Sequence, residues 1–326
     1  MILLTGGNGL IGSFIARKLL AEKAAFKILI RSTANLSLLE DVKSQIQFIE
    51  GDILDIISLE NAFEGIDEVI HCAAVVSFGE VSNELMFKIN LEGTKNMVNT
   101  ALMFGVRRFC YLSSVAAIGR DPKAAIIDEN TKWIASDLNS QYAISKYLAE
   151  LEVWRGIEEG LSGIMLCPTV VLGPGNWNRS STKLFKNMYK GMKFYPSGSV
   201  NVVDVRDVAD AAWLALKSNI SAERYLINAQ NLSYKDFFSK IALGFGNKPP
   251  SVKLTKNIIL PFYYLLKIVA PFYLKKRYIN KETIVISNSH FEYGNEKFIK
   301  AFNFNYRSTD DAIKWVCEGL LKKIGD

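Results

Sequence analysis

The sequence feature that most constrains this chain is a glycine-rich turn near residue 10. Glycines at positions 6, 9 and 12 stand in the segment Thr5-Gly6-Gly7-Asn8-Gly9-Leu10-Ile11-Gly12, between a short apolar stretch and a helical pattern. Glycines let the backbone approach a pyrophosphate, and the helix start adds free N–H groups and the positive end of its dipole. These flanks favour a dinucleotide site over a tight turn without a ligand. The residues expected to hold the dinucleotide are Gly6, Gly9, Leu10, Ile11 and Gly12.

Apolar strands and helices alternate through the first half of the chain. Short apolar runs predict strands at residues 2–4, 26–30, 46–49, 68–72, 109–113 and 163–166, with helical patterns at about 12–23, 58–63, 84–103 and 142–158. Nearly continuous apolar strands separated by helices are typical of an α/β fold with a doubly wound parallel sheet of the Rossmann type.

The regular alternation ends at residue 172, which suggests a second, smaller part of the molecule. A loop rich in glycine and proline begins at Gly173, and residues 231–326 show a mixed, helix-rich pattern. We expect residues 1–172 and 200–230 to form the NAD(P)-binding domain. Residues 173–199 and 231–326 are expected to form a C-terminal substrate-binding cap.

The residues that follow the second and third strands are expected to contact the adenosine half of the dinucleotide and to distinguish NAD from NADP. Arg31 follows the second strand, at the place where an acidic residue would bind the ribose 2′-hydroxyl of NAD. An arginine suits a 2′-phosphate instead, so the sequence favours NADP, with NAD as second choice; the alternative is an exposed arginine without a ligand. After the third strand, Asp52 is expected to accept a hydrogen bond from the adenine amino group while Ile53 packs on the ring.

A tyrosine and a lysine four residues apart form the candidate catalytic group. Tyr142 and Lys146 fall on one face of a predicted helix. An ammonium ion near a phenol favours the phenolate, so we expect Lys146 to lower the Tyr142 pKa and Tyr142 to exchange protons near neutral pH. Ser114 follows the fifth strand, at the sheet edge where ligands bind, and is expected to hydrogen-bond a substrate oxygen; Ser113 is its near-equivalent competitor.

Taken in order, these motifs resemble the extended short-chain dehydrogenase/reductase family, also described as the NAD-dependent epimerase/dehydratase superfamily. The resemblance runs from Thr5 to at least Ala209 and more loosely to the end of the chain. Besides the glycine turn, the matching segments are Gly51-Asp52-Ile53, His71-Cys72-Ala73-Ala74, Asn90-Leu91-Glu92-Gly93-Thr94, Ser113-Ser114, Tyr142-Ala143-Ile144-Ser145-Lys146, Pro168-Thr169-Val170-Val171-Leu172-Gly173-Pro174-Gly175 and Val203-Asp204-Val205-Arg206-Asp207-Val208-Ala209.

The resemblance implies roles for individual residues. Tyr142 would be the general acid/base, Lys146 would hold the nicotinamide ribose, and Ser114 would orient the reacting oxygen. The other residues implied at the cofactor are Ala73 and Ala74 beside a ribose, and Pro168 and Val170 at the nicotinamide end. Asn90 would be structural. Many relatives carry arginine immediately before Pro168, and we interpret Cys167 there as a change of packing or charge without consequence for hydride transfer.

The branch of the family, and therefore the substrate, is less constrained. Arg31 and the polar loop after it resemble the dihydroflavonol-reductase-like branch, which implies an NADP(H)-dependent oxidoreductase that reduces a ketone or aldehyde, or oxidises the alcohol. One alternative is an NAD-dependent nucleotide-sugar epimerase or dehydratase, in which Arg179, Lys183 or Arg206 would bind the diphosphate of the substrate. Another resembles 3β-hydroxysteroid dehydrogenases, which act on apolar alcohols. Phe78 is a candidate substrate contact, and a non-catalytic sensor is disfavoured by the intact Ser-Tyr-Lys set.

Composition excludes several other classes. The net charge is +6, too small to indicate nucleic acid, and four widely spaced cysteines indicate neither a disulfide framework nor a metal site. With two histidines, a zinc site is not expected. No secretory pattern begins the chain, so we expect a cytoplasmic protein with a small-molecule substrate. The helices at 84–104 and 142–158 resemble the dimer face of the family and predict a homodimer.

Charge is unevenly distributed along the chain. Residues 231–326 carry 16 Lys+Arg against 8 Asp+Glu, and from residue 231 to residue 281 Asp236 is the only acidic residue against ten basic ones. The apolar, aromatic run within 257–281 is interrupted by prolines and is too short to span a bilayer. It is expected to be a pair of core helices of the cap, to line an apolar pocket, or to make peripheral contact with a membrane surface.

Overall fold

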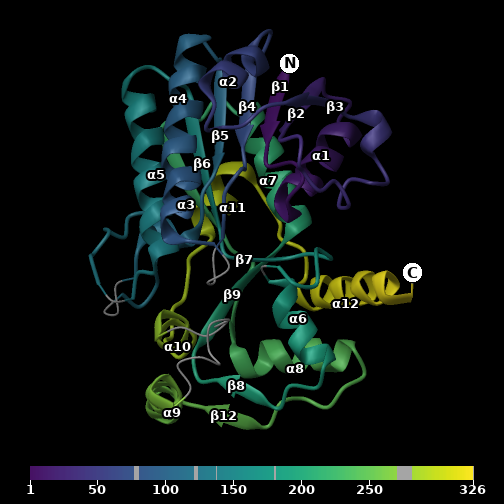
Figure 1. Cartoon of the computed structure of the whole chain (residues 1–326), viewed down its shortest axis with the longest axis vertical. Coiled ribbons are helices and arrows are strands. Elements are labelled where there is room, and N and C mark those ends of the chain that lie inside the picture. Colours follow the sequence, from purple (N-terminus) through teal and green to yellow (C-terminus); the bar gives the residue numbers. More distant parts are fainter. Residues whose placement is uncertain (77–80, 121–123, 137, 180, 270–280, 326) are drawn as a thin grey trace.

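The computed structural model describes the chain except for residues 77–80, 121–123, 137, 180, 270–280 and 326. A central sheet with helices on both faces forms one end of the molecule, and smaller sheets with their own helices form the other (Figure 1). The predicted contact of Phe78 lies outside the described residues, as do residues 270–280 of the segment 257–281.

The central sheet has seven parallel strands in the order β10-β6-β5-β4-β1-β2-β3. The chain crosses from one half of the sheet to the other between β3 and β4, so the strand order reverses beside β1, where ligands bind in folds of this kind. The predicted doubly wound parallel sheet is confirmed. Its strands are β1 (Ile2–Thr5), β2 (Phe26–Ile30), β3 (Gln47–Glu50), β4 (Glu68–His71), β5 (Arg108–Leu112), β6 (Gly163–Pro168) and β10 (Glu223–Ile227).

Alternate residues of each central strand face opposite layers of helices. Leu4 and Ile28 pack against α1 (Leu10–Ala21) and α7 (Val205–Lys217), whereas Leu3 and Leu29 pack against the helices of the other face. Because both faces are covered, the strands read as continuous apolar runs. The helices of the second face are α2 (Ile56–Phe63), α4 (Gly93–Met103) and α5 (Gln141–Glu158).

The predicted helix at 84–103 is interrupted where it approaches the sheet edge. It consists of α3 (Asn83–Phe87), a π-helical turn η2 (Lys88–Glu92) and α4. Such π turns are frequent at functional sites. Here the turn contains the buried Asn90, whose hydrogen bonds are described below.

The cap is built around two small sheets. Strands β7 (Val170–Leu172), β9 (Ser199–Asp204) and β11 (Gln230–Ser233) form one, and β8 (Phe194–Pro196) and β12 (Val252–Leu254) form the other. A separate apolar core lies between these strands and the cap helices. The cap helices are α6 (Thr182–Tyr189), α8 (Tyr234–Gly244), α9 (Lys256–Val269), α10 (Lys281–Ser287) and α12 (Thr309–Gly325).

One element from the C-terminal part of the chain packs on the central sheet. Helix α11 (Glu296–Phe302) lies against β10, where Phe298 meets the ring of Tyr225 edge-on at 5.7 Å between centroids. Short 3-10 turns, η1 (Lys43–Gln45) and η3 (Val115–Ile118), complete the described elements. Within the part of the chain that the structure describes, no helix has the length and apolarity needed to cross a bilayer.

Candidate active site

The glycine turn after β1 is shaped by close backbone contacts. A Cβ atom on Gly6 would lie 2.6 Å from the Ala73 nitrogen, and one on Gly12 would lie 2.1 Å from the Gly6 carbonyl oxygen. Gly6 also has a φ of +68°, a backbone conformation that favours glycine. The fold itself therefore requires glycine at positions 6 and 12.

Gly9 differs from these two glycines and is the better sign of a ligand. It is exposed, its φ of −85° is ordinary, and the single described atom within 4 Å of a built Cβ is the Gly6 oxygen at 3.3 Å. It stands at the N-terminus of α1, where no described side chain caps the helix. The first N–H groups of a helix lack intrahelical acceptors, so this start fits a phosphate group, and the residues present fit a dinucleotide.

The strand ends proposed for the adenosine half lie at the same sheet edge. Arg31 directly follows β2, is exposed, and its backbone oxygen accepts a hydrogen bond from the Ala34 N–H. Asp52 follows β3, the neighbouring strand, and its Oδ1 accepts from the Leu54 N–H at 3.0 Å. The Ile53 side chain is buried against Gly93 of α4. The predicted adenosine residues are thus neighbours in space.

The candidate catalytic side chains converge at the end of β5. Tyr142 and Lys146 lie one turn apart in α5, whose N-terminus is capped by the Ser140 hydroxyl. Ser114 caps the turn η3 and accepts from the Ala116 N–H at 3.2 Å, and its hydroxyl lies near enough to Tyr142 to act on the pKa of that phenol. The competing Ser113 hydroxyl is buried without a hydrogen-bond partner among the described residues. The structure therefore brings Ser114, and not Ser113, to Tyr142.

The charge states differ from the sequence prediction. Burial raises the pKa of Tyr142 to about 12, and the hydrogen bond from Ser114 opposes this rise. Lys146 is buried and donates to the Tyr111 hydroxyl at 2.7 Å and to the Leu112 carbonyl at 3.0 Å. The expected lowering of the Tyr142 pKa by Lys146 is therefore wrong for the protein alone, because Lys146 is directed to Tyr111.

Burial also acts on the lysine. It lowers the pKa of Lys146 to about 8, while the nearby Glu150 carboxylate raises it. Glu150 lies one further turn along α5 and is buried. Lys146 consequently carries its charge at neutral pH and begins to lose it in mildly alkaline solution.

A buried chain of hydrogen bonds connects the glycine turn to α5. The Thr5 hydroxyl pairs with His71 Nδ1 at 2.7 Å, and His71 Nε2 pairs with the Thr94 hydroxyl at 3.1 Å. Burial and Lys146 lower the pKa of His71 to about 3, so its ring is neutral. Asn90 links the Val75 backbone to the Ser145 hydroxyl, donating to each at 3.0 Å. The structural role expected for Asn90 is consistent with these contacts.

An ion pair lies behind the lysine, in contact with Cys167. The Cys167 thiol donates to Glu150 Oε1 at 3.2 Å, and Arg224 of β10 pairs with Glu150 Oε2 at 3.2 Å. Arg224 reaches Glu150 from the neighbouring strand, where it pairs with Met165, two residues before Cys167. The sequence analysis did not identify Glu150 or Arg224.

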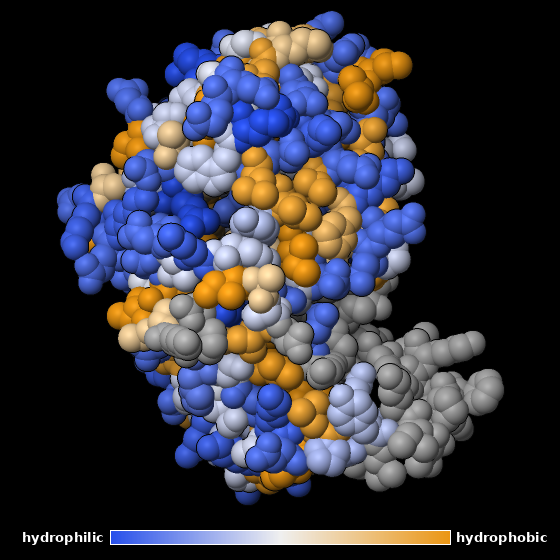
Figure 2. All heavy atoms as spheres, turned by 90° about the vertical axis from the view of Figure 1, so that its left-hand side faces the viewer, coloured by the Kyte–Doolittle hydropathy of each residue, from blue (hydrophilic) through white to orange (hydrophobic). Residues whose placement is uncertain are grey.

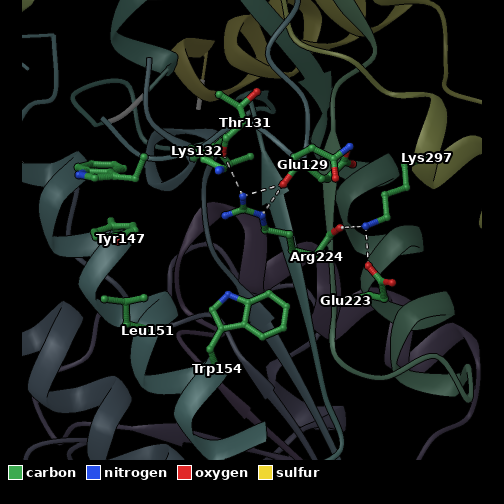
Figure 3. Close-up of a pocket in the computed structure, with 12 residues that line it drawn as sticks. Glu129, Thr131, Lys132, Tyr147, Leu151, Trp154, Glu223, Arg224 and Lys297 are labelled. Atoms are coloured by element: carbon green, nitrogen blue, oxygen red, sulfur yellow. Dashed lines mark hydrogen bonds and ion pairs between the residues drawn. The ribbon is translucent and has the colours of Figure 1, made fainter. Parts of the chain in front are cut away.

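The same arginine borders a pocket on a second face of α5. Figure 3 shows Arg224 beside Glu129 and Thr131, with Tyr147, Leu151 and Trp154 of α5 on the opposite wall. The cavity measures about 450 Å³. Tyr142 and Lys146 do not line it, so this pocket is separate from the candidate catalytic group.

The remaining predicted cofactor residues also follow strand ends. Ala73 and Ala74 follow β4, Pro168 ends β6, and Val170 begins β7. The Ala73 N–H donates to the Thr5 hydroxyl at 3.1 Å, which joins this strand end to the glycine turn. Leu10 lies beside the loop at Gly173. The topology therefore gathers the predicted residues at the carboxyl ends of the strands.

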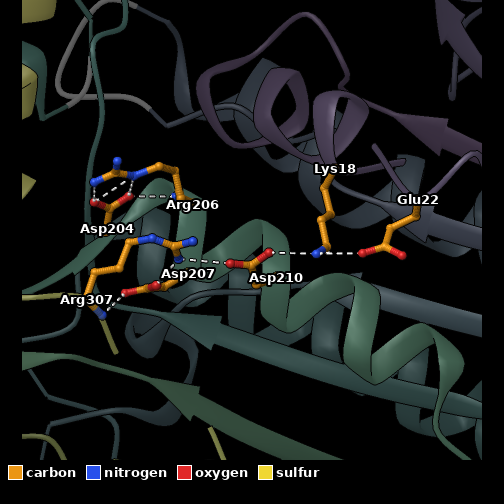
Figure 4. A network of polar contacts seen from close by, with 7 residues as sticks. All are labelled: Lys18, Glu22, Asp204, Arg206, Asp207, Asp210 and Arg307. Atoms are coloured by element: carbon orange, nitrogen blue, oxygen red, sulfur yellow. Dashed lines mark hydrogen bonds and ion pairs between the residues drawn. The ribbon is translucent and has the colours of Figure 1, made fainter. Parts of the chain in front are cut away.

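Arg206, one of the residues predicted to bind a substrate diphosphate, is paired with other side chains of the protein. Its guanidinium contacts both carboxylate oxygens of Asp204 and lies 3.8 Å from the Trp315 ring centroid. Figure 4 shows this pair beside a second group of contacts, in which Arg307 joins Asp207 to Asp210 and Lys18 joins Asp210 to Glu22. Arg179 is exposed. Arg206 therefore serves the junction of β9 and α7.

Comparison with known proteins decides the family. Residues 2–228, which hold every candidate site residue, match the NAD dependent epimerase/dehydratase family. The chain belongs to this family. It is accordingly an NAD(P)-dependent enzyme of the extended short-chain dehydrogenase/reductase type.

Individual relatives of this family member include reductases. A putative dihydroflavonol 4-reductase of Synechocystis sp. is 28% identical over 276 residues, covering 82% of this chain and 79% of the relative. Sterol demethylase protein B of Methylococcus capsulatus is 28% identical over 233 residues, covering 70% of each chain. The crystal structure of gox2253 has a TM-score of 0.86 at 29% identity and covers all of this chain and 98% of its own.

A more distant structure supports the fold alone. UDP-glucose 4-epimerase of Thermotoga maritima, solved with UDP-glucose, has a TM-score of 0.81 at 20% identity, covering all of this chain and 99% of its own. The agreement extends over the cap as well as the central sheet.

Proposed function

We propose that this enzyme is an NADP(H)-dependent oxidoreductase that reduces a ketone or aldehyde to the alcohol, or catalyses the reverse oxidation. The observation that carries the proposal is the position of the Ser114 hydroxyl near the Tyr142 phenol at the end of β5, with Lys146 one helical turn further. The putative dihydroflavonol 4-reductase and the cinnamoyl-CoA reductase of Oryza sativa, 29% identical over 242 residues, support a reductase.

The protein residues divide the work around the reacting oxygen. A bound nicotinamide cofactor supplies or accepts the hydride. Tyr142 donates the proton to the carbonyl oxygen from its Oη atom, and the high pKa keeps this proton available at neutral pH. Ser114 Oγ accepts from the Ala116 N–H, and the hydroxyl that acts on Tyr142 in the protein alone would donate its proton to the reacting oxygen when a substrate is bound. In the protein alone Lys146 donates to Tyr111 and Leu112, and we propose that it turns to the nicotinamide ribose when the cofactor is bound, where its charge would favour the Tyr142 phenolate.

NADP rather than NAD is proposed from the end of β2. Arg31 is exposed beside the glycine turn, where its guanidinium can meet a 2′-phosphate. Titration of intrinsic fluorescence with NADPH and NADH, after release of any retained nucleotide, tests this choice. We expect tighter binding of NADPH, and expect Arg31→Ala to reduce the preference about tenfold, the loss of roughly 1.4 kcal/mol. Retained NAD, or equal affinity, would favour the epimerase or dehydratase alternative.

The catalytic proposal is tested by a matched pair of serines. NADPH consumption is followed with a panel of aromatic, aliphatic and alicyclic ketones and aldehydes. Ser114→Ala should lower kcat by about 10²-fold, the scale of one lost transition-state hydrogen bond. Ser113→Ala is the control and should retain activity, since its hydroxyl has no partner among the described residues. Equal losses in both variants would remove Ser114 from the mechanism.

An apolar alcohol is the alternative substrate that the relatives favour. Sterol demethylase protein B of Methylococcus capsulatus and a 3beta-hydroxysteroid-dehydrogenase/decarboxylase of Arabidopsis thaliana are similar to this chain, the latter 24% identical over 253 residues. Including 3β-hydroxysteroids with NADP⁺ and NAD⁺ in the panel distinguishes the two substrate classes.

We also propose a cytoplasmic homodimer formed through α4 and α5. The two helices pack side by side on one face of the central sheet (Figure 1), and Met103 and Leu151 are 62% and 44% exposed. Light scattering should give twice the chain mass of 36.5 kDa. Leu151→Glu should shift the mass to that of one chain, and a monomeric parent protein would remove the proposal.

A further inference from the structure

The far end of the cap combines exposed lysines with exposed apolar side chains. Strands β8 and β12 pair in parallel there, with Phe194 opposite Val252, and α9 follows β12 directly. Figure 1 places these elements at the opposite end of the molecule from β1 and α2. We call the exposed side chains of this region the basic end: Tyr189, Lys190, Lys193, Phe194, Lys248, Val252, Lys253, Lys256, Ile258 and Tyr264.

The apolar members of the basic end are turned away from the core. Phe194 and Val252 are 46% and 44% exposed, whereas Tyr195, the next residue along β8, packs against the cap core. Since neighbouring strand residues point to opposite faces, Phe194 and Val252 share one exposed face of the ribbon, whereas Lys253, which pairs with Tyr195, extends from the other face and is exposed there. Ile258, in the first turn of α9, is 58% exposed. Figure 2 shows hydrophobic side chains at the surface of the cap end, among hydrophilic ones.

The charge of the region is nearly all of one sign. Residues 182–196 and 234–269 contain ten lysines and one acidic residue, Asp236, which is bonded to the Ser233 hydroxyl at the start of α8. From α12, Asp310 is paired with Lys240. Asp310 therefore offsets Lys240, and Asp236 offsets one more lysine, which leaves eight of the ten positive charges in these two segments unbalanced within them.

We propose that the basic end docks the enzyme peripherally on an anionic lipid bilayer. Lysines near such a surface are attracted to the negative headgroups, and exposed valine, isoleucine and aromatic side chains gain by entering the boundary of the acyl chains. A soluble polyanion offers the charge but no apolar phase for Val252 and Ile258. The lysine side chains bring their ammonium groups to the headgroups while their stems cover apolar surface.

This surface is built by the fold and goes beyond the proposed function. The sequence suggested membrane contact through residues 257–281, of which residues 270–280 lie outside the described part. The structure adds Lys193 and Phe194 of the preceding loop and β8, because β8 pairs with β12. When the cap end contacts the bilayer, the carboxyl ends of the central strands lie on the part of the enzyme that does not contact it.

Co-sedimentation with vesicles tests the proposal without measuring turnover. The full-length protein is mixed with phosphatidylcholine vesicles and with vesicles in which about a third of the lipid is phosphatidylserine. We expect binding to the anionic vesicles alone, weakened by added salt. Two double variants are compared with the parent protein: Lys193→Glu with Lys253→Glu, and Phe194→Ser with Ile258→Ser. Each should lower the partition coefficient about tenfold or more, because the attraction of one lysine near the surface is about 1 kcal/mol.

The controls separate local docking from net charge and from misfolding. Lys23→Glu with Lys300→Glu changes the net charge equally at exposed positions, one after α1 and one on α11 against the central sheet, and should retain binding. Thermal unfolding confirms that each variant is folded. Failure to bind anionic vesicles overturns the proposal, as does binding to heparin in its place. A loss in the charge control equal to that of the basic-end variants overturns it too.

Discussion

The catalytic end of α5 and the basic end of the cap use charge in opposite ways. Lys146, Glu150 and His71 are buried, and each is held by named hydrogen bonds or an ion pair. Lys253 is exposed on the short strand β12, and Lys193 is exposed in the loop before β8. The energetic effect of a buried charge depends on where its partners lie. An exposed lysine has a small effect by itself and acts together with the other charges around it. Single substitutions should therefore be severe in the first region and mild in the second.

The largest effect is expected from removing the buried ammonium group. Lys146→Met should reduce kcat/KM by about 10³-fold, within the range of general acid–base contributions, because Tyr142 loses the charge that favours its phenolate. The fold should persist, since methionine fills the site without a buried charge. Steady-state kinetics and thermal unfolding measure the two properties. Activity within about threefold of the parent would contradict a catalytic role for this lysine.

The next effect concerns stability at the network of Figure 4. The Asp207 side chain is fully buried and pairs with Arg307, whose side chain is 40% exposed. Arg307→Met should cost about 2 kcal/mol, less than a fully buried pair because this arginine is partly solvated and the backbone N–H at 307 still donates to Asp207. Lys300→Met, which breaks an exposed pair with Glu296, should cost under about 0.5 kcal/mol.

The pH dependence of that loss has a definite sign. Burial raises the pKa of Asp207, and Arg307 opposes this. Without Arg307 the pKa of Asp207 rises further, so the folded state holds a proton to higher pH than the unfolded chain does. The deficit of Arg307→Met should therefore grow as the pH increases from about 4 to 7 in denaturant titrations. A deficit that shrinks over this interval would contradict the assignment.

A smaller effect is expected from the carboxylate behind the lysine. Glu150 raises the Lys146 pKa, so Glu150→Gln should lower it below about 8 and move the alkaline decline of kcat/KM to lower pH. At mildly alkaline pH this should appear as roughly a threefold loss relative to neutral pH. Cys167→Ser keeps a donor to Glu150 and is the control. An unchanged pH profile in Glu150→Gln would leave Glu150 with a packing role alone.

The smallest effect should be found at the basic end. Lys253→Met should leave the free energy of unfolding within about 0.5 kcal/mol, because an exposed lysine of this kind contributes little to folding. Chemical denaturation measures it beside Arg307→Met. A loss comparable to that of Arg307→Met would show that the two regions do not differ as described.

Local motifs predicted the central part of the molecule well. The strand–glycine–helix segment and the apolar runs specify the doubly wound sheet, because each of these signals is contained within a short stretch of neighbouring residues. The residues of the candidate site are gathered for the same reason, since parallel strands bring their carboxyl ends to one edge. The spacing of Tyr142 and Lys146 likewise placed both on α5.

Contacts between residues that are far apart in the sequence could not be predicted from local motifs. Arg224 and Glu150 are 74 positions apart and meet because β10 pairs with β6. The direction of the Tyr142 pKa depends on burial and on Lys146 turning to Tyr111, which a four-residue spacing does not encode. Lys193 and Lys253 are likewise joined by the pairing of β8 with β12. In each case, tertiary contact supplied what local pattern lacked.

The most direct test of the account compares two tyrosines of α5. Tyr142 lies at Ser114, whereas Tyr147 stacks on Trp133 at 4.2 Å between ring centroids. With the best carbonyl substrate of the panel, Tyr142→Phe should lower kcat by about 10³-fold while NADPH affinity stays within about threefold. Tyr147→Phe should retain both properties. Full turnover in Tyr142→Phe would contradict proton transfer by this residue, and with it the central claim.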